Sequence, residues 1–257
     1  MEGNLVLPGD PLPIESKNIT TNIGPGVTKD PKTQRIIPSS AGLLHIKSNK
    51  SKASQVVYIE SRETRYIPKT NDFVVGVITA VFGDFYRVSL QDYSPPVQLS
   101  MTAFPNATKK NRPNLKVGQV VYARVSEAVP EIEAEIECID PTTGKEGGFG
   151  LLDESGYLFS VRLNFARELL FNQNSIYLEK LAAKCKFEIA IGINGKIWIK
   201  CGDGLIIQRN EDSETVDKAS QIKSLKTTIA AANFLIKCQT SRPVDIDSIL
   251  HETFKSI

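Results

Sequence analysis

A run of basic side chains in the middle of the chain is the first candidate for chemistry. Residues 105–125 include five basic residues and no acidic one, whereas residues 127–140 include six acidic residues and no basic one. The basic residues are Lys109, Lys110, Arg112, Lys116 and Arg124. Such side chains in a flexible loop neutralise phosphates without reading a base sequence, which predicts a nucleic-acid surface. A solvated loop that keeps the protein soluble explains the same composition.

Aromatic residues beside a predicted turn add a second kind of nucleic-acid chemistry. Phe82, Phe85 and Tyr86 flank Gly83-Asp84, and Arg87 follows them. Exposed rings on one face of a small barrel can stack with bases. Phe85 and Tyr86 are neighbours in an extended segment, so one points into the core and the other is free to stack. Either assignment fits the sequence, and for each ring taken singly a core position is the commoner outcome.

The segment Gly192-Ile-Asn-Gly195 has the spacing of the phosphate-gripping loop of KH domains, but its surroundings differ. That loop joins two helices, whereas here two strand-like runs flank the motif. Asn-Gly between strands predicts a type I′ hairpin turn. Residues 171–175, between two predicted helices, contain no glycine. The sequence therefore predicts a KH-like order without the KH grip.

Catalytic and metal-binding patterns are sparse. The four cysteines, Cys138, Cys185, Cys201 and Cys238, form no CxxC pair, and there are only two histidines. The acidic pairs Asp84/Asp92 and Glu131/Glu133 have no motif that places them in a pocket, and residues 144–150 lack a Walker ending. We therefore expect no enzyme activity, cofactor or metal. Unclustered cysteines and the absence of a secretory signal or a membrane-length apolar run predict a protein of a reducing compartment.

Three regions differ in their element patterns. Residues 1–65 contain short strands, with 43–47 and 55–60 forming a hairpin around a polar tip, which indicates a small β domain. Residues 66–141 contain five strand-like runs, which predict a closed OB-type barrel. These runs are 73–82, 85–90, 97–100, 119–125 and 132–140. In the last run Ile132, Ala134, Ile136 and Cys138 alternate with four glutamates, which predicts one core face and one acidic face.

Residues 148–257 predict an α+β domain in the order of a type I KH fold. A strand at 157–163 precedes a helix capped by Asn164 and a second helix capped by Ser175. The hairpin 186–191 and 196–200 follows, and Pro243 opens a final helix. Between them Ile222, Leu225, Ile229, Ala232 and Ile236 recur every three or four residues, as on the buried face of an amphipathic helix. The fold class is therefore mainly β with an α+β region.

Three segments together resemble a known family. Residues 65–90, 107–125 and 192–200 resemble, in order and spacing, the three-domain cap subunits of the eukaryotic RNA exosome, the ribosomal RNA-processing protein 40 family. The resemblance covers nearly the whole chain. It implies an N-terminal β domain at 1–65, an S1-type barrel at 66–141 and a KH domain at 148–257.

The resemblance also implies a role without catalysis. Cap subunits of this kind stabilise a ring of RNase PH-like subunits and line the entrance through which single-stranded RNA is threaded, in the nucleus, the nucleolus and the cytoplasm. Gly192, Asn194 and Gly195 would then support the contact between barrel and KH domain. The N-terminal domain would dock onto the ring and other cap subunits through Pro8, Gly9, Gly24 and Gly26. The RNA-contacting residues would be Lys109, Lys110, Arg112, Lys116, Phe85 and Arg87.

Two alternatives and one departure from the family pattern complete the expectations. A stand-alone single-stranded RNA-binding protein of a translation or RNP complex would share these domains, and a nuclease would add metal-dependent cleavage. The net charge of +2 favours a subunit with protein neighbours, because a free RNA binder is more often basic overall. Residues 202–216 lengthen the connection before the third KH helix, and we expect them to be mobile or packed against a neighbouring subunit.

Overall fold

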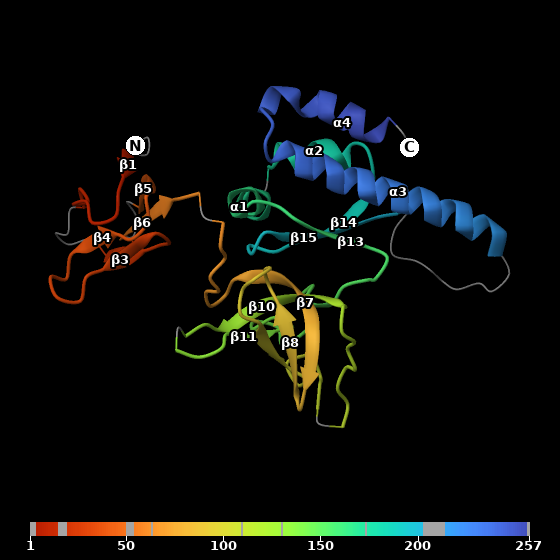
Figure 1. Ribbon diagram of the computed structural model, residues 1–257, viewed down its shortest axis with the longest axis horizontal. Helices are drawn as coiled ribbons and strands as arrows, with labels where there is room; N and C mark the ends of the chain where they lie inside the picture. Colours follow the sequence, from red (N-terminus) through yellow and green to blue (C-terminus); the bar gives the residue numbers. More distant parts are fainter. Residues whose placement is uncertain are drawn as a thin grey trace. The chain divides into compact units, whose positions relative to one another are not determined.

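The computed structural model describes residues 4–14, 20–49, 54–62, 64–108, 110–129, 131–172, 174–202 and 214–255 (Figure 1). The chain divides into two compact units, Met1–Glu63 and Thr64–Ile257. Most of the longer connection predicted at residues 202–216 lies outside the described residues. The second unit contains both the barrel and the KH-like region.

The N-terminal unit is a small β structure. Its main sheet has the strand order β1-β5-β6-β2, and β3 and β4 form a separate pair. The strands are β1 (Asn4–Val6), β2 (Thr20–Ile23), β3 (Val27–Lys29), β4 (Ile36–Pro38), β5 (Gly42–Asn49) and β6 (Ser54–Glu60). Val6, Leu44, Val57 and Ile59 form its core. The predicted hairpin of residues 43–47 and 55–60 is confirmed by the β5–β6 pairing.

The barrel begins the second unit. Its strands are β7 (Phe73–Phe82), β8 (Phe85–Ser89), β9 (Val97–Ser100), β10 (Val120–Glu127) and β11 (Glu135–Glu137), and the short β12 (Gly150–Leu151) adds to β10. The order β11-β9-β8-β7-β10 closes through the β10–β11 pairing, with β9 and β11 parallel. Val74, Ile78, Val88, Leu99 and Ile136 fill the interior. The predicted five-strand barrel is confirmed.

The last barrel strand is shorter than predicted. Only Glu135–Glu137 pairs as a strand, and Ile132 is 55% exposed rather than part of a core face. The Ile132 N–H bonds to the Val129 carbonyl, so the chain is still turning where the alternation begins. Alternation marks a potential strand, but strand partners exist only for the middle of the predicted run, residues 135–137.

The KH-like region follows the predicted order of elements. Its sheet has the order β13-β15-β14, and helices accompany it (Figure 1). The elements are β13 (Tyr157–Ser160), α1 (Leu163–Phe171), α2 (Ile176–Ala182), β14 (Phe187–Ile191), β15 (Lys196–Cys201), α3 (Glu214–Cys238), the 3₁₀ turn η1 (Pro243–Asp245) and α4 (Ile246–Phe254). Phe159, Leu181, Ile197, Phe234 and Leu235 lie in its core.

The helix caps differ from the prediction. Helix α1 begins at Leu163 after Arg162, so Asn164 lies inside the helix and does not cap it. Ser175 does precede α2, but its side chain makes no capping hydrogen bond. Within the described part of the chain, the buried Oδ1 of Asn164 and Oγ of Ser175 have no hydrogen-bond partner.

Helix α3 presents a different face to the core from the one predicted. Ile222, Leu225 and Ile229 are 54%, 47% and 49% exposed, whereas Ala232 is buried. Two hydroxyls decide the orientation: Ser224 Oγ donates to the Cys201 carbonyl, and Thr228 Oγ1 accepts from the Cys201 N–H. These bonds turn the face with Ala231 and Leu235 toward the sheet. Periodicity alone identified the helix but assigned the wrong inner face.

Candidate nucleic-acid interface

The β7–β8 hairpin ends in two exposed phenylalanines. Phe82 and Phe85 face each other across the strands on either side of the Gly83-Asp84 turn. Phe82 is 72% exposed and Phe85 39%, whereas Tyr86 is 1% exposed. The Tyr86 hydroxyl donates to the Pro113 carbonyl at 2.6 Å and accepts the Leu115 N–H at 3.2 Å. Of the two neighbouring rings, Phe85 is therefore the one that is free to stack, and Tyr86 lies in the core. Phe82 extends the exposed surface.

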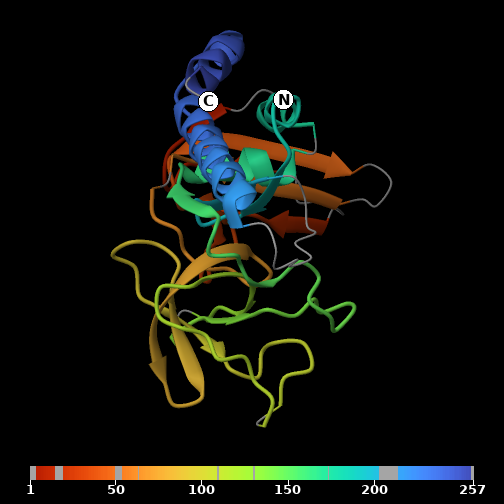
Figure 2. The same cartoon turned by 90° about the vertical axis from the view of Figure 1, so that its right-hand side faces the viewer.

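The loop of residues 107–113, called the basic loop below, lies at the same end of the barrel as this hairpin, as Figures 1 and 2 show. Thr108 and Asn111 bond to each other's backbone and close a tight turn, and Lys110 is exposed within it. Lys109 lies outside the described residues. The Arg112 guanidinium forms an ion pair with Asp84, the residue before Phe85. Since this ion pair is exposed, a phosphate can compete for the arginine.

A polar surface continues from Phe85 along β8 and β9. Phe85 pairs with Ser100, and Arg87 pairs with Gln98, so these side chains lie side by side on the outside of the barrel. Arg87 Nη1 lies 3.5 Å from Glu133 Oε1, with both side chains 41% exposed. Arg87 is therefore placed on the predicted face, but it already has an acidic partner.

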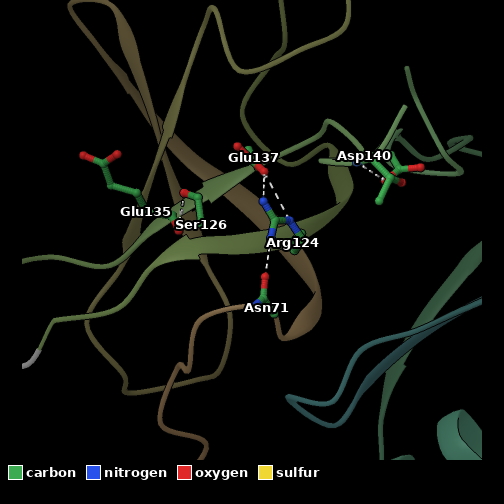
Figure 3. A network of polar contacts seen from close by, with 7 residues as sticks. Asn71, Arg124, Ser126, Glu135, Glu137 and Asp140 are labelled. Atoms are coloured by element: carbon green, nitrogen blue, oxygen red, sulfur yellow. Dashed lines mark hydrogen bonds and ion pairs between the residues drawn. The ribbon is translucent and has the colours of Figure 1, made fainter. Parts of the chain in front are cut away.

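Arg124 does not belong to this open surface. Its guanidinium contacts Glu137 and Asn71, as Figure 3 shows, and its side chain is only 14% exposed. Two glutamates of the acidic segment 127–140, Glu133 and Glu137, thus pair with arginines of the same barrel. Among the described ion pairs, Arg124–Glu137 joins the basic segment to the acidic one, whereas Arg112 and Glu133 pair with residues outside these segments.

Two shallow grooves lie beside the loop segments. One, of about 450 Å³, is lined by Asn106, Asn111, Arg112, Glu146 and Phe149, so it runs directly along the basic loop. The other, of about 350 Å³, is lined by Lys116, Glu154 and Trp198, where the barrel meets the KH-like region. The Arg112–Asp84 ion pair thus links the loop to the hairpin that carries Phe82 and Phe85, whereas Lys116 borders the second groove.

Asn194 connects the KH-like region to the barrel. Its side chain is 1% exposed, and it bonds to Val75 and Leu90 of the barrel. Oδ1 accepts the Val75 N–H at 3.2 Å, and Nδ2 donates to the Val75 and Leu90 carbonyls at 2.9 and 2.5 Å. The side-chain amide thus bonds to both the N–H and the carbonyl of Val75 in β7, as the backbone of a neighbouring strand would. Around it, Val75, Ala190 and Trp198 form a small apolar cluster.

The glycines around Asn194 fit this contact. A Cβ on Gly192 would lie 2.6 Å from the Val75 nitrogen, so a larger residue would separate the two regions. Gly195 has a φ of +81°, but Asn194 is not among the residues with positive φ. The predicted type I′ turn, which needs positive φ at both central residues, is therefore wrong. A bond from the Gly195 N–H to the Gly192 carbonyl closes a β-turn centred on Ile193 and Asn194 instead, and a bond from the Gly192 N–H to the Lys196 carbonyl closes the three-residue loop 193–195.

The glycines expected to dock onto a ring have contacts within the N-terminal unit. A Cβ on Gly24 would lie 2.7 Å from Tyr58 Cβ, and one on Gly26 would lie 2.8 Å from Ile59 Cβ. Both positions therefore allow the chain to approach β6 closely. Pro8 and Gly9 are exposed, and the Gly9 N–H bonds to the Pro38 carbonyl.

The described residues hold neither a metal-binding cluster nor a membrane-spanning helix. No group of three or more His, Cys, Asp or Glu side chains in that part of the chain could hold a metal ion. None of its helices is both long enough and apolar enough to cross a membrane.

Comparison with known proteins identifies the family. Residues 66–150 match the model "Exosome complex component RRP40, S1 domain", residues 156–205 match "KH domain", and residues 21–65 match "Exosome complex exonuclease Rrp40 N-terminal domain". The chain is 53% identical to Exosome complex component RRP40 of Saccharomyces cerevisiae over 196 residues, covering 76% of this chain and 81% of that protein. The chain belongs to the Rrp40 family of exosome components. The resemblance stated from the sequence is therefore confirmed.

More distant relatives carry the same name. Exosome complex component rrp40 of Schizosaccharomyces pombe is 37% identical over 86% of this chain and 93% of that protein. The human Exosome complex component RRP40 is 31% identical over 84% of this chain and 70% of that protein. A solved structure with "exosome complex RNA-binding protein" in its description has a TM-score of 0.50 at 18% identity, covering 74% of this chain and 96% of that one. That last likeness shows a shared fold.

Sequence reasoning missed Phe82 as a member of the exposed pair. A residue just before a two-residue turn faces its partner just after the turn, so Gly83-Asp84 already implied that Phe82 accompanies Phe85. How exposed the rings of Phe82 and Phe85 are, by contrast, depends on how far the hairpin extends past the barrel. The local sequence does not determine that length.

Proposed function

We propose that the chain is a non-catalytic cap subunit of the RNA exosome that guides single-stranded RNA at the pore entrance and stabilises the RNase PH-like ring. The observation that carries the RNA role is the exposed Phe82–Phe85 pair beside the Arg112–Asp84 ion pair at one end of the barrel. Membership of the Rrp40 family, whose members are named exosome components, supports the assembly role.

The hairpin end has the chemistry of a sequence-tolerant RNA surface. Two exposed rings provide platforms on which bases stack, at about 1–3 kcal/mol per base. Lys110 and Arg112, with Lys109 next to them in the sequence, provide charge for the phosphates. The groove beneath Asn111 and Arg112 leaves room next to the loop for part of a nucleotide. RNA would then follow the outside of the barrel toward Arg87.

The KH-like region has a different role in this proposal. Asn194 and Gly192 use the segment between β14 and β15 for contact with the barrel, so that segment is not available to grip RNA. The region would instead hold the barrel in a fixed orientation toward the RNA path. Absence of catalysis in the chain is part of the proposal, and nuclease activity would reside in other subunits.

Docking and location follow from the assembly role. The N-terminal unit, with Pro8, Gly9, Gly24 and Gly26, would contact ring and cap subunits, the two inner glycines by shaping the surface rather than touching the partner. As an exosome subunit, the protein would be found in the nucleus, including the nucleolus, and in the cytoplasm.

Removal of the two rings tests the RNA role. The double substitution Phe82→Ala and Phe85→Ala, in the full chain assembled into the exosome, should reduce photocrosslinking of RNA to this subunit at least tenfold, since about 2 kcal/mol of stacking is lost. Phe171→Ala is a matched control, because Phe171 is similarly exposed, at 67%, at the end of α1. Equal crosslinking in both variants would contradict the proposal.

The isolated chain separates this function from the alternatives. A cap subunit should bind single-stranded RNA weakly and cleave nothing, with or without divalent cations. Tight binding by the isolated chain, together with failure to co-purify with RNase PH-like subunits, would favour a stand-alone RNA-binding protein. Cleavage by the purified chain would favour a nuclease.

A further inference from the structure

Two cysteines that are separated in the sequence meet in the KH-like region. Cys185 Sγ and Cys201 Sγ lie 3.9 Å apart, in van der Waals and weak hydrogen-bond contact. Cys201 is the last residue of β15 and pairs with Phe187, and Cys185 lies two residues before Phe187 on the same side of the sheet. Diagonal neighbours of this kind are within reach of each other's side chains.

The segment that holds Cys185 is not part of a helix or strand, and its Cys185 N–H bonds to the Leu181 carbonyl of α2 at 3.1 Å. It lies in the turn between α2 and β14, where only the Gly202 N–H to Lys186 carbonyl bond, at 3.4 Å, continues the ladder. Closing the sulfur separation to the roughly 2.0 Å of a disulfide therefore requires movement of this turn rather than of β15. Cys185 is half-buried, so a small oxidant can reach its sulfur, whereas Cys201 is 1% exposed.

The surroundings of the two sulfurs favour loss of one proton. The Cys185 thiol and the Thr228 hydroxyl both stabilise negative charge on Cys201, which lowers the pKa of the Cys201 thiol. The remaining proton lies between the two sulfurs, so the pKa for its loss is raised. The pair therefore places a thiol of lowered pKa in contact with a second thiol, which is the arrangement that converts an oxidised sulfur into a disulfide.

The other two cysteines lack this arrangement. Burial raises the pKa of Cys138 to about 12 and that of Cys238 to about 11. Both side chains are buried, at 0% and 1% exposed. All four cysteines are free thiols in the structure. Selectivity for one pair is thus expected from geometry as well as from acidity.

We propose that Cys185 and Cys201 are a site of reversible oxidation by hydrogen peroxide, forming an intramolecular disulfide. In the first step a thiolate of the pair attacks a peroxide oxygen: an S–O bond forms, the O–O bond breaks and hydroxide leaves. The second sulfur then attacks the sulfenic sulfur, forming the S–S bond as the S–O bond breaks and a second hydroxide leaves. The two thiol protons convert both hydroxides to water, so one peroxide is reduced as two thiols are oxidised.

The disulfide would join the turn after α2 to the end of β15. Helix α3 is tied to the same point, because Ser224 and Thr228 bond to the backbone of Cys201. Oxidation would therefore stiffen the place where β15 ends and the chain leads toward α3.

The test treats the reduced full-length protein with hydrogen peroxide, unfolds it in urea, blocks the remaining thiols with iodoacetamide and measures the intact mass. The oxidised chain should carry two alkyl groups where the reduced chain carries four, and dithiothreitol before blocking should restore all four. Non-reducing peptide mapping should join Cys185 to Cys201. Cys185→Ala should abolish the product, whereas the control Cys238→Ala should retain it.

Two other outcomes would overturn the proposal. Addition of one or more oxygen atoms without a disulfide would show that the second sulfur does not reach the first. A disulfide involving Cys138 or Cys238, or one between two chains, would assign the reactivity elsewhere. Circular dichroism of Cys185→Ala and of the conservative Cys185→Ser identifies a folding defect, and the peptide map of the wild-type protein decides the question without either variant.

Discussion

Asn194 shows how a single side chain can have another role than its sequence motif predicts. Asn-Gly between strands predicts a turn residue, and a turn residue is replaceable at about 1 kcal/mol. The structure instead places its amide against Val75 and Leu90, buried and fully engaged. The partners come from 119 and 104 residues away, and no local pattern carries that information.

Asn194→Ala should therefore destabilise the second unit more than a turn substitution would. The change leaves the Val75 N–H and the Leu90 carbonyl buried without a partner, so we expect a loss of about 3 kcal/mol in the free energy of unfolding. Urea denaturation of the full chain measures it. Asn233→Ala, at an exposed position of α3, is the control and should be nearly neutral. A loss below about 1 kcal/mol would show that the contact contributes little.

At the scale of elements, the sequence predicted most strands and helices but not their faces or ends. Paired turns and alternation located β5–β6, β7–β8 and β14–β15, since these hairpins depend on local geometry. The end of β11 and the inner face of α3 depend on distant partners, Gln98 and Cys201, and were predicted wrongly. The candidate site shows the same contrast. The sequence predicted which residue types it contains, but not the ion pairs of Arg87 and Arg124 with distant glutamates.

The short segment between barrel and β13 gives a prediction about pH. Lys200 Nζ lies 2.6 Å from Asp153 Oδ2, and this bond, with help from Ser155, lowers the pKa of Asp153 to about 2. The Asp153 carbonyl also accepts the indole N–H of Trp198 at 3.2 Å. A carboxylate with a lowered pKa stabilises the fold above its unfolded value of about 4, and that contribution disappears as the pH falls toward about 2.

Asp153→Asn should therefore be less stable than the wild type at pH 7, and the difference should shrink below about pH 4. Because the side chain of Asp153 is 52% exposed, solvent screening makes the effect small, and denaturation at low ionic strength is the suitable measurement. Lys200→Gln removes the same bond from the other side and should show the same convergence. Parallel stability curves for wild type and Asp153→Asn from pH 7 to pH 3 would rule out this contribution.

The net charge of the whole chain is only +2, and the barrel pairs several of its own charges. Three arginines around the candidate interface face acids of the same barrel, in the pairs Arg87–Glu133, Arg112–Asp84 and Arg124–Glu137. Within residues 105–125, the described lysines Lys110 and Lys116 are exposed, and Arg112 is exposed in its ion pair with Asp84. A net charge of +2 is then compatible with local RNA contact while leaving little attraction for nucleic acid elsewhere on the chain.

This local surface sets the salt dependence of RNA binding. Three phosphate contacts on a single strand, from Lys109, Lys110 and Arg112, give a slope of about −2 in log affinity against log salt. Charge reversal of these three residues to Glu should remove that slope and weaken RNA threading by the assembled exosome, while assembly itself continues. Reversal of Lys180, Lys223 and Lys226 in the KH-like region makes the same change in net charge and should leave the slope intact. If the loop variant folded but no longer entered the exosome, the loop would be a protein interface, and the RNA path would have to lie elsewhere on the barrel.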